Sequence, residues 1–180
     1  MFKGQVAPTD SPVWCAQRVG QSITFLPKGR IIQIGGEHED HYDPDFCIYN
    51  DVFVHEPDGA IRIFCYPEAV FPPTDFHTAT LLGRYIYIIG SLGYSGTRGQ
   101  SRTPMYRLDT NSFQIEEIRA DGTDPGWIYG HAAIALSAHQ IRVTGGTILT
   151  CTGGKEVHVE KDRSFIFDTR QKVWAMSNDR

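Results

Sequence analysis

The sequence lacks any long hydrophobic run, because no segment approaches 18 consecutive apolar residues, so no membrane-spanning helix is expected. Residues 1–21 contain Pro8, Asp10 and Pro12 and no apolar stretch, so no secretory signal is expected there. The chain also lacks a basic tail, and its 17 basic and 21 acidic residues give a net charge of −4. These absences predict a cytoplasmic protein that binds neither nucleic acid nor a membrane surface.

Paired cysteines are also absent. The four cysteines show no CxxC spacing, and they stand at Cys15, Cys47, Cys65 and Cys151. In a protein without a secretory signal, this pattern predicts reduced, buried thiols and no disulfide framework.

The short motifs of catalysis and cofactor binding are missing as well. The chain contains no GxSxG elbow, no Walker loop, no GxGxxG fingerprint and no HExxH zinc motif. The sequence therefore specifies no reaction, and no cofactor is expected.

What the chain does contain favours strands and turns. Aromatic residues make up 12% of it, with 18 Gly and 10 Pro, and no window shows a 3.6-residue hydrophobic period. Short apolar runs that alternate or are briefly continuous predict an all-β fold.

Three units of about 55 residues repeat along the chain. The pairs Gly35-Gly36, Gly90-Ser91 and Gly145-Gly146 each follow an apolar run and begin 55 positions apart. A second run precedes each of them, and two more follow, the last pair joined by a polar turn. Each unit therefore predicts four short strands. The units are expected at about 22–66, 77–119 and 131–176, within one domain over 22–180 that follows an N-terminal extension, 1–21.

This pattern resembles the kelch repeat. The third unit is the fullest match, with Gly145-Gly146, then the run from Phe165 to Asp168, then Trp174, whereas the second unit has Ser91 in place of the second glycine. The resemblance implies a kelch-type β-propeller, with three four-stranded antiparallel blades forming half of a ring. It implies a binding scaffold rather than an enzyme.

Three blades are fewer than the four to eight of known propellers. The two terminal blade faces are then left uncovered, and the simplest expectation is a homodimer that completes a six-bladed ring. An open or differently closed monomer, and a fragment that needs a different partner chain, remain as alternatives.

The long connections are expected to share one end of the scaffold, where function usually lies. The first of them, 37–49, carries a dense acidic and histidine cluster, namely Glu37, His38, Glu39, Asp40, His41, Asp43 and Asp45. It is interpreted as a solvated acidic loop, a contact for a basic partner, or a divalent-cation site with Glu39, His41 and Asp43 as candidate ligands. The last option makes a small metal-dependent enzyme or metal binder the alternative function.

Two other connections supply candidate contact residues. Arg98 and Arg102 lie in the Gly/Ser-rich stretch 91–104 and are expected to pair with the acidic loop or to bind an anionic ligand. Trp127 and Tyr129 are expected to anchor a ligand or to pack between units. His77 and His131 share one repeat position, which favours a structural role for both imidazoles.

Overall fold

The structure is a computed structural model that describes residues 17–38, 46–98 and 102–177. It is all-β, and its one helical element is the 3₁₀ turn Pro27–Gly29. No helix of the described residues is long and apolar enough to cross a membrane.

Each repeat contributes four antiparallel strands, in chain order, to one sheet, and a short parallel strand extends the third sheet to five strands. Sheet 1 contains β1 (Ser22–Phe25), β2 (Ile31–Ile34), β5 (Asp51–His55) and β6 (Ile61–Cys65). Sheet 2 contains β7 (Thr78–Leu82), β8 (Tyr85–Ile89), β9 (Met105–Asp109) and β10 (Ile115–Glu117). Sheet 3 contains β13 (Ala132–Ser137), β14 (Gln140–Thr144), β17 (Ser164–Asp168) and β18 (Val173–Met176).

The turns that join the third and fourth strands of sheets 2 and 3 are built alike. The Asp109 carboxylate accepts the backbone N–H of Asn111 at 2.9 Å, and the Asp168 carboxylate accepts that of Arg170 at 2.9 Å. Four residues after each aspartate the backbone adopts a positive φ. The repeated acidic residues are therefore turn-forming residues, as Asx side chains often are.

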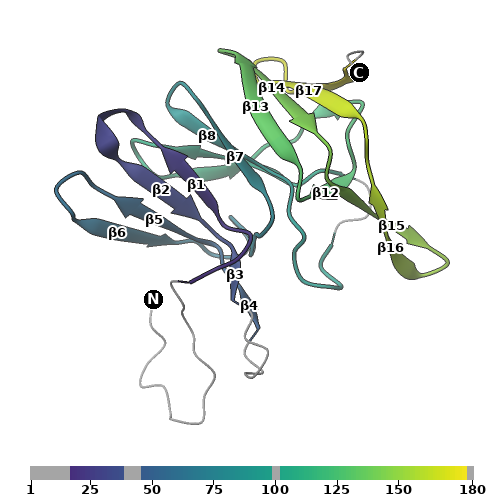
Figure 1. The fold of residues 1–180 in the computed structure, drawn as a ribbon, viewed down its shortest axis with the longest axis horizontal. Coiled ribbons are helices and arrows are strands. Elements are labelled where there is room, and N and C mark those ends of the chain that lie inside the picture. The colour runs from purple at the N-terminus through teal and green to yellow at the C-terminus, as the bar shows by residue number, and fades with distance from the viewer. Residues whose placement is uncertain (1–16, 39–45, 99–101, 178–180) are drawn as a thin grey trace, which may run out of the picture.

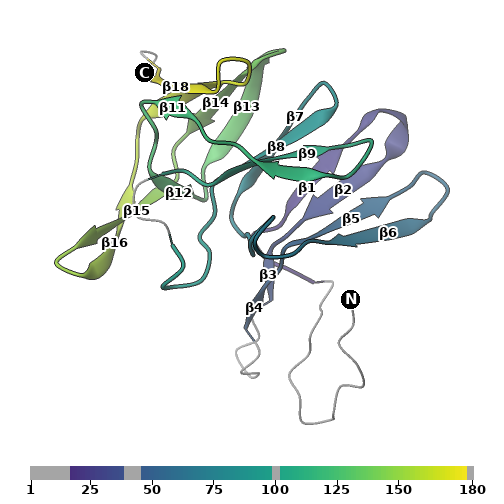
Figure 2. The same cartoon turned by 180° about the vertical axis from the view of Figure 1, so that it is seen from behind.

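The three sheets stand one after another, with their first strands adjacent (Figures 1 and 2). Strand β1 lies beside β7, and β7 lies beside β13. The later strands of each sheet spread away from this shared inner edge. Sheet 2 is thus covered on both faces, whereas sheets 1 and 3 are each covered on one.

Two hydrophobic clusters fill the spaces between the sheets. The first joins Ile32 and Val54 of sheet 1 to Ile86 and Leu108 of sheet 2, all at 0% exposure. The second joins the opposite face of sheet 2 to sheet 3, and it includes Tyr87, Ile89, Met105, Ile141, Val143, Phe165, Phe167 and Trp174. Alternate residues of β8 enter different clusters, which explains why this strand reads as a continuous apolar run.

A repeated set of hydrogen bonds also links neighbouring sheets. Nε2 of His77 lies 2.7 Å from the Ser22 hydroxyl, and Nε2 of His131 lies 2.8 Å from the Thr78 hydroxyl. Ser22 and Thr78 are the first residues of β1 and β7, so each imidazole reaches the inner strand of the preceding sheet. These contacts agree with the structural role expected for both histidines, and in each case the partner is the first residue of a strand in the preceding sheet.

Backbone groups repeat the same link. The Gly36 N–H donates to the Thr74 carbonyl at 2.8 Å, and the Ser91 N–H donates to the Ile128 carbonyl at 3.0 Å. The Phe76 N–H donates to the Gly20 carbonyl at 2.8 Å, and its own carbonyl accepts the Gly130 N–H at 2.8 Å. Together with the histidine contacts, these bonds form what we call the inter-sheet lock.

Two of the long connections contain strands of their own. The stretch 147–162 forms a hairpin of β15 (Thr147–Thr152) and β16 (Lys155–Glu160), and 120–130 contains β11 (Asp121–Gly122) and β12 (Trp127–Tyr129). Strand β11 pairs in parallel with β18, and β12 pairs with β15. The hairpin of β15 and β16 was not predicted, although the sequence carries a signal for it. β-Branched residues stand on both sides of Gly153-Gly154, and both glycines have positive φ.

Cys15 lies outside the described residues, and the other three cysteines are free thiols that are not buried as expected. Cys65 and Cys151 are exposed, and Cys47 is half-buried. Cys65 ends the outer strand β6, and Cys151 lies near the tip of the β15–β16 hairpin, so neither packs into an inter-sheet cluster.

Candidate functional site

The long connections converge on one end of the sheets and bind one another there. Between β2 and β5, the short pair β3 (Glu37–His38) and β4 (Cys47–Ile48) forms a separate two-stranded sheet that extends from this end. The Ile48 backbone N–H donates to the Tyr94 hydroxyl at 2.7 Å, and Phe46 meets the Tyr94 ring edge-on at 5.7 Å. Burial raises the pKa of Tyr94, which keeps its phenol neutral.

Arg98 links the second connection to the third. Its guanidinium lies 2.6 Å from the Glu156 carboxylate on β16, and its Nε donates to the Gly93 carbonyl at 3.1 Å. The sequence predicts that Arg98 pairs with the acidic loop or binds an anionic ligand, but its carboxylate partner within the described residues is Glu156. The hairpin β15–β16 supplies that partner.

The two aromatic candidates, Trp127 and Tyr129, lie on β12. One contacts the connection 91–104 and the other contacts the β15–β16 hairpin. The Trp127 indole N–H donates to the Leu92 carbonyl at 3.3 Å. The Tyr129 hydroxyl lies 2.8 Å from Nδ1 of His158, and the two rings meet edge-on. Both side chains are half-buried, so each packs between connections and also presents one edge outward.

Asp75 organises this end of the molecule, a role that sequence analysis did not assign. The carboxylate is fully buried, and its Oδ1 accepts the Gly93 N–H at 2.7 Å and the Ser91 hydroxyl at 3.2 Å. Its Oδ2 has no hydrogen-bond partner among the described residues. Asp75 therefore holds the start of the connection 91–104 against the link between sheets 1 and 2.

A cavity of about 700 Å³ opens beside this anchor, between the connections that enter and leave sheet 2. Its walls include Thr74, Tyr106 and Trp127, and its charged lining residues are Arg102, Glu117, Arg119 and Asp124. The Asp124 carboxylate is engaged by the backbone N–H groups of Thr103 and Gly126. Arg119 lies 3.3 Å from Glu117, whereas Arg102 is exposed. The cavity thus combines two aromatic rings with an exposed guanidinium, and of the two arginines predicted for ligand contact only Arg102 lines it.

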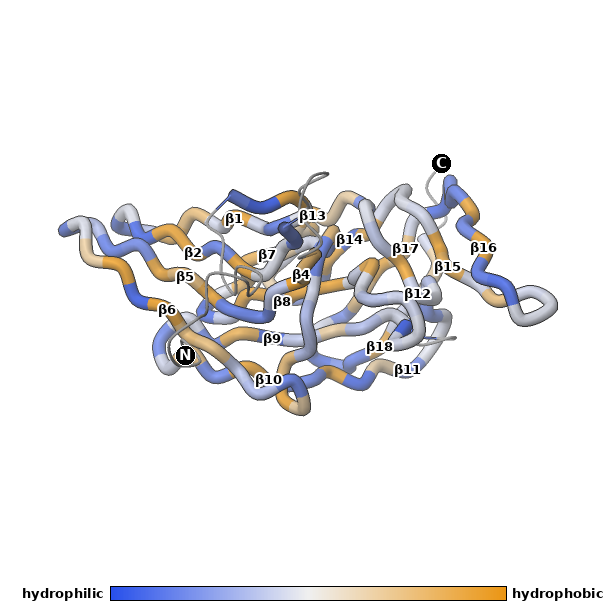
Figure 3. The backbone as a smooth tube through the Cα atoms, turned by 90° about the horizontal axis from the view of Figure 1, so that it is seen from below, coloured by the Kyte–Doolittle hydropathy of each residue, from blue (hydrophilic) through white to orange (hydrophobic). Residues whose placement is uncertain are grey.

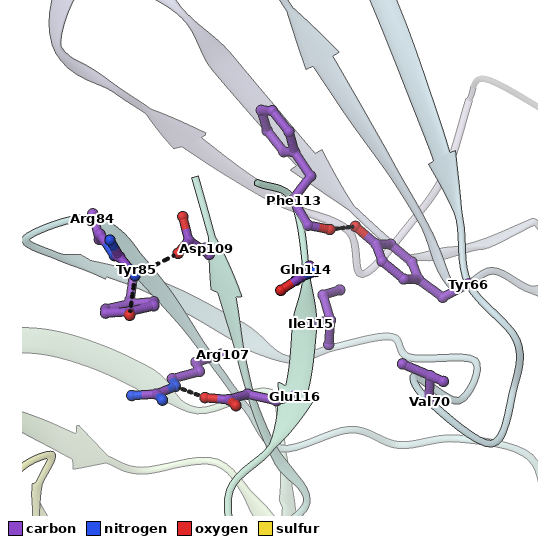
Figure 4. A pocket seen from close by; sticks show the side chains of 10 residues that line it. All are labelled: Tyr66, Val70, Arg84, Tyr85, Arg107, Asp109, Phe113, Gln114, Ile115 and Glu116. Carbon is purple, nitrogen blue, oxygen red and sulfur yellow. Dashed lines mark hydrogen bonds and ion pairs between the residues drawn. The ribbon is translucent and has the colours of Figure 1, made fainter. Parts of the chain in front are cut away.

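A smaller cavity of about 400 Å³ lies near the opposite turns of sheet 2, and its charged groups face one another (Figure 4). Arg84 lies 3.0 Å from Asp109 and donates to the Tyr85 hydroxyl at 2.7 Å. Arg107 pairs with Glu116 and lies over the Tyr85 ring. Since both guanidinium groups are engaged inside the cavity, an incoming anion would have to displace an ion pair.

Most of the acidic loop lies outside the described residues, including Glu39, Asp40, His41, Asp43 and Asp45. Of its members the structure describes Glu37, which is buried in β3 and exchanges backbone hydrogen bonds with Val19, and His38, which pairs with Cys47 across the strands. Within 17–38, 46–98 and 102–177, no three His, Cys, Asp or Glu side chains gather in a metal-binding arrangement.

The comparisons with known proteins found neither a family model nor a curated protein that matches the chain.

Proposed function

We propose that the protein is a non-enzymatic binding module of the kelch type, built from propeller blades and contacting its ligand at the end where the long connections meet. Three sheets that each contain four antiparallel strands in chain order, with their first strands adjacent, support the blade interpretation. A rigid β scaffold that carries long connections at one end is the usual arrangement of a binding site.

The observation that carries this proposal is the cavity of about 700 Å³ beside sheet 2. Its volume lies in the range of small-molecule sites. Arg102 offers a guanidinium that suits a carboxylate or phosphate, and Trp127 and Tyr106 offer aromatic surface. The cavity therefore favours a small molecule or peptide side chain that combines an anionic group with a flat apolar part.

The test uses benzoate as an aromatic anion and benzamide as its neutral counterpart. We expect benzoate, and not benzamide, to shift the indole N–H resonance of Trp127 in a saturable way. The Arg102→Gln variant should lose this shift, because it keeps a polar side chain but removes the positive charge. Arg84→Gln, in the smaller cavity, is the matched control and should behave as wild type. Equal shifts from both compounds, or an unchanged response in Arg102→Gln, would count against the site.

A further inference from the structure

The inter-sheet lock forms twice, between sheets 1 and 2 and between sheets 2 and 3. Sheet 1 and sheet 3 each also carry one half of the same contact without a neighbouring sheet to complete it. Strand register places Ser22, Thr78 and Ala132 at one equivalent position, since they pair with Ile34, Ile89 and Thr144 immediately before the repeat glycines. The residue before each is Gln21, His77 or His131. At the uncovered face of sheet 1, Gln21 therefore stands where the other two sheets have a histidine. At the uncovered face of sheet 3, Ala132 stands where sheets 1 and 2 have a hydroxyl.

The repeat glycines show the same asymmetry. A Cβ on Gly35 would collide with the Thr74 carbonyl, and one on Gly90 would collide with the Ile128 carbonyl and lie 2.6 Å from Cε1 of His131. Each of these contacts comes from the following sheet or its leading segment. Gly145 keeps the same left-handed backbone, with φ of +65°, but no described atom lies within 4 Å of its Cβ position. The surface that receives the next sheet is present on sheet 3, and no fourth sheet from the described part of the chain occupies it.

Sheet 1 has the complementary free surface. The residues of its strands that do not face sheet 2 are largely apolar, and four of them are strongly exposed: Ile23 (49%), Phe25 (73%), Ile61 (57%) and Ile63 (49%). The strand pairing forms one cross-strand row of Ile23, Gln33, Phe53 and Ile63 and a second row of Phe25, Ile31, His55 and Ile61. The polar residues Gln33 and His55 lie in the middle of these rows and contact each other at 2.6 Å. Figure 3 shows hydrophobic positions along β2, β5 and β6 at this end of the array. Four exposed apolar side chains on one sheet face mark that face as an interface.

Sheet 1 packs one face against sheet 2, and sheet 2 packs its equivalent face against sheet 3. The equivalent face of sheet 3 is the uncovered one. Ile134, Arg142, Ile166 and Ala175 form one cross-strand row there. Ile134 is 54% exposed, and every residue of the inner strand β13 except Ala133 is exposed. The equivalent strand of sheet 2, β7, is covered by its neighbour on each side.

From these observations we propose that two copies of the chain associate head to tail, with the free face of sheet 3 in each copy receiving the free face of sheet 1 in the other. The chain carries both halves of this contact, so a second copy satisfies both free ends at once. Two copies then close a ring of six sheets, within the range of known propellers. In this ring Gln21 of one copy faces Ala132 of the other, and the backbone ahead of β1 approaches Gly145. The inference concerns surfaces remote from the cavity and does not depend on ligand binding.

The experiment measures the mass of the full chain in solution by light scattering at micromolar concentration. Wild type should have about twice the chain mass of 20.2 kDa. Phe25→Asp on sheet 1 and Ile134→Asp on sheet 3 should each yield folded monomers, because a carboxylate buried in either contact raises the dissociation constant at least about thirtyfold. Val70→Asp, an exposed apolar position on the link between sheets 1 and 2, is the matched control and should keep the wild-type mass.

Mixing the two monomeric variants gives the sharpest result. A pair made of Phe25→Asp and Ile134→Asp places both substitutions in one contact and leaves the other intact, so dimers should partly return. Circular dichroism confirms that each variant is folded.

A second pair of variants tests the receiving surface on Gly145. Gly145→Ala and Gly83→Ala change glycines with similar backbone angles and no described neighbour within 4 Å. Only Gly145→Ala should weaken association, at least about tenfold.

Four outcomes would overturn the proposal. A wild-type mass near 20.2 kDa throughout would mean that the free faces do not take a second copy. A dimer sensitive to Phe25→Asp but not to Ile134→Asp would indicate that two sheet 1 faces pair with each other. The absence of dimers in the mixture would exclude the head-to-tail arrangement. A mass that grows with concentration beyond two copies would exclude closure of the ring.

Discussion

The imidazole of His77 is hydrogen-bonded to the hydroxyl of Ser22, 55 positions earlier, and this contact ties the inner strand of sheet 1 to sheet 2. Its Nδ1 has no hydrogen-bond partner within the described residues, and the same is true of Nδ1 of His131. Burial, and then the proximity of His131, lower the pKa of His77 to about 3. Burial lowers the pKa of His131 to about 4. Both imidazoles are therefore neutral in the folded protein at pH 7.

These two pKa values predict a loss of stability on mild acidification. In the unfolded chain the histidines titrate near 6.5, so below that pH the unfolded state binds more protons than the folded state. The stabilisation is complete above pH 6.5 and is lost as the pH falls toward 4 and then 3. Each histidine should lower the free energy of unfolding by about 2 kcal/mol between pH 7 and pH 5. Urea denaturation across this range measures the loss.

His77→Gln provides the control for this pH dependence. Glutamine occupies the equivalent position in the first repeat, at Gln21, and its amide does not titrate. The variant should lose about half of the pH dependence, whatever its absolute stability at pH 7. An unchanged slope between pH 7 and pH 5 would show that the buried histidines do not cause it.

The repeat glycines lead to a second prediction, which separates backbone strain from steric contact. Gly83 and Gly90 both have positive φ, but a Cβ on Gly83 meets nothing within 4 Å, whereas one on Gly90 collides with the Ile128 carbonyl. Gly83→Ala should cost about 1 kcal/mol, the penalty of the left-handed conformation. Gly90→Ala should cost more than about 3 kcal/mol, because a backbone carbonyl and the His131 ring must also move. Chemical denaturation of both variants tests the difference, and equal costs would contradict the close approach between sheets 2 and 3.

The strands of the three sheets could be predicted because each repeat supplies the same local information. An apolar run, a glycine that permits positive φ and an Asx turn specify their structure within a few residues, as at Gly90 and Asp109. The role of His77 could be inferred only in part. Its repetition indicated a structural contact, but the partner Ser22 lies in another sheet, and no local pattern connects the two.

The connections could not be predicted in the same way, because their structure depends on contacts between repeats. Strand β12 exists as a strand because β15 pairs with it, and β11 because it lies along β18. Likewise, Arg98 finds Glu156 only once the third connection has formed a hairpin. Asp75 gave no sequence signal, since its importance comes from complete burial beside Ser91 and Gly93.

The buried pair Arg18–Asp51 gives a third prediction. The side chains are 3% and 7% exposed, they form two hydrogen bonds, and the guanidinium lies 3.6 Å from the centre of the Tyr49 ring. Removing either charge leaves the other buried, so Asp51→Asn and Arg18→Met should each cost about 3 to 5 kcal/mol. The double variant should cost much less than the sum of the two. Urea denaturation of all four proteins measures the coupling, and additive losses would show that the charges do not interact.

The last prediction concerns the ion pair between Arg98 and Glu156, which joins two connections at the candidate binding end. The side chains are 13% and 34% exposed, so solvent screens the attraction and the coupling should stay below about 1 kcal/mol. Strand β16 is exposed along its whole length, and its attachment to the rest of the molecule depends on few contacts. Arg98→Gln should therefore leave global stability nearly unchanged while the amides of β16 exchange up to about fivefold faster, the ratio that corresponds to 1 kcal/mol.

Raising the salt concentration should speed exchange in wild type but have little further effect in Arg98→Gln, since the charge pair is already gone. Glu160→Gln, on the same strand, is the control and should leave exchange as in wild type. Unchanged exchange in Arg98→Gln would mean that the pairing of β15 with β12 holds the hairpin without the ion pair.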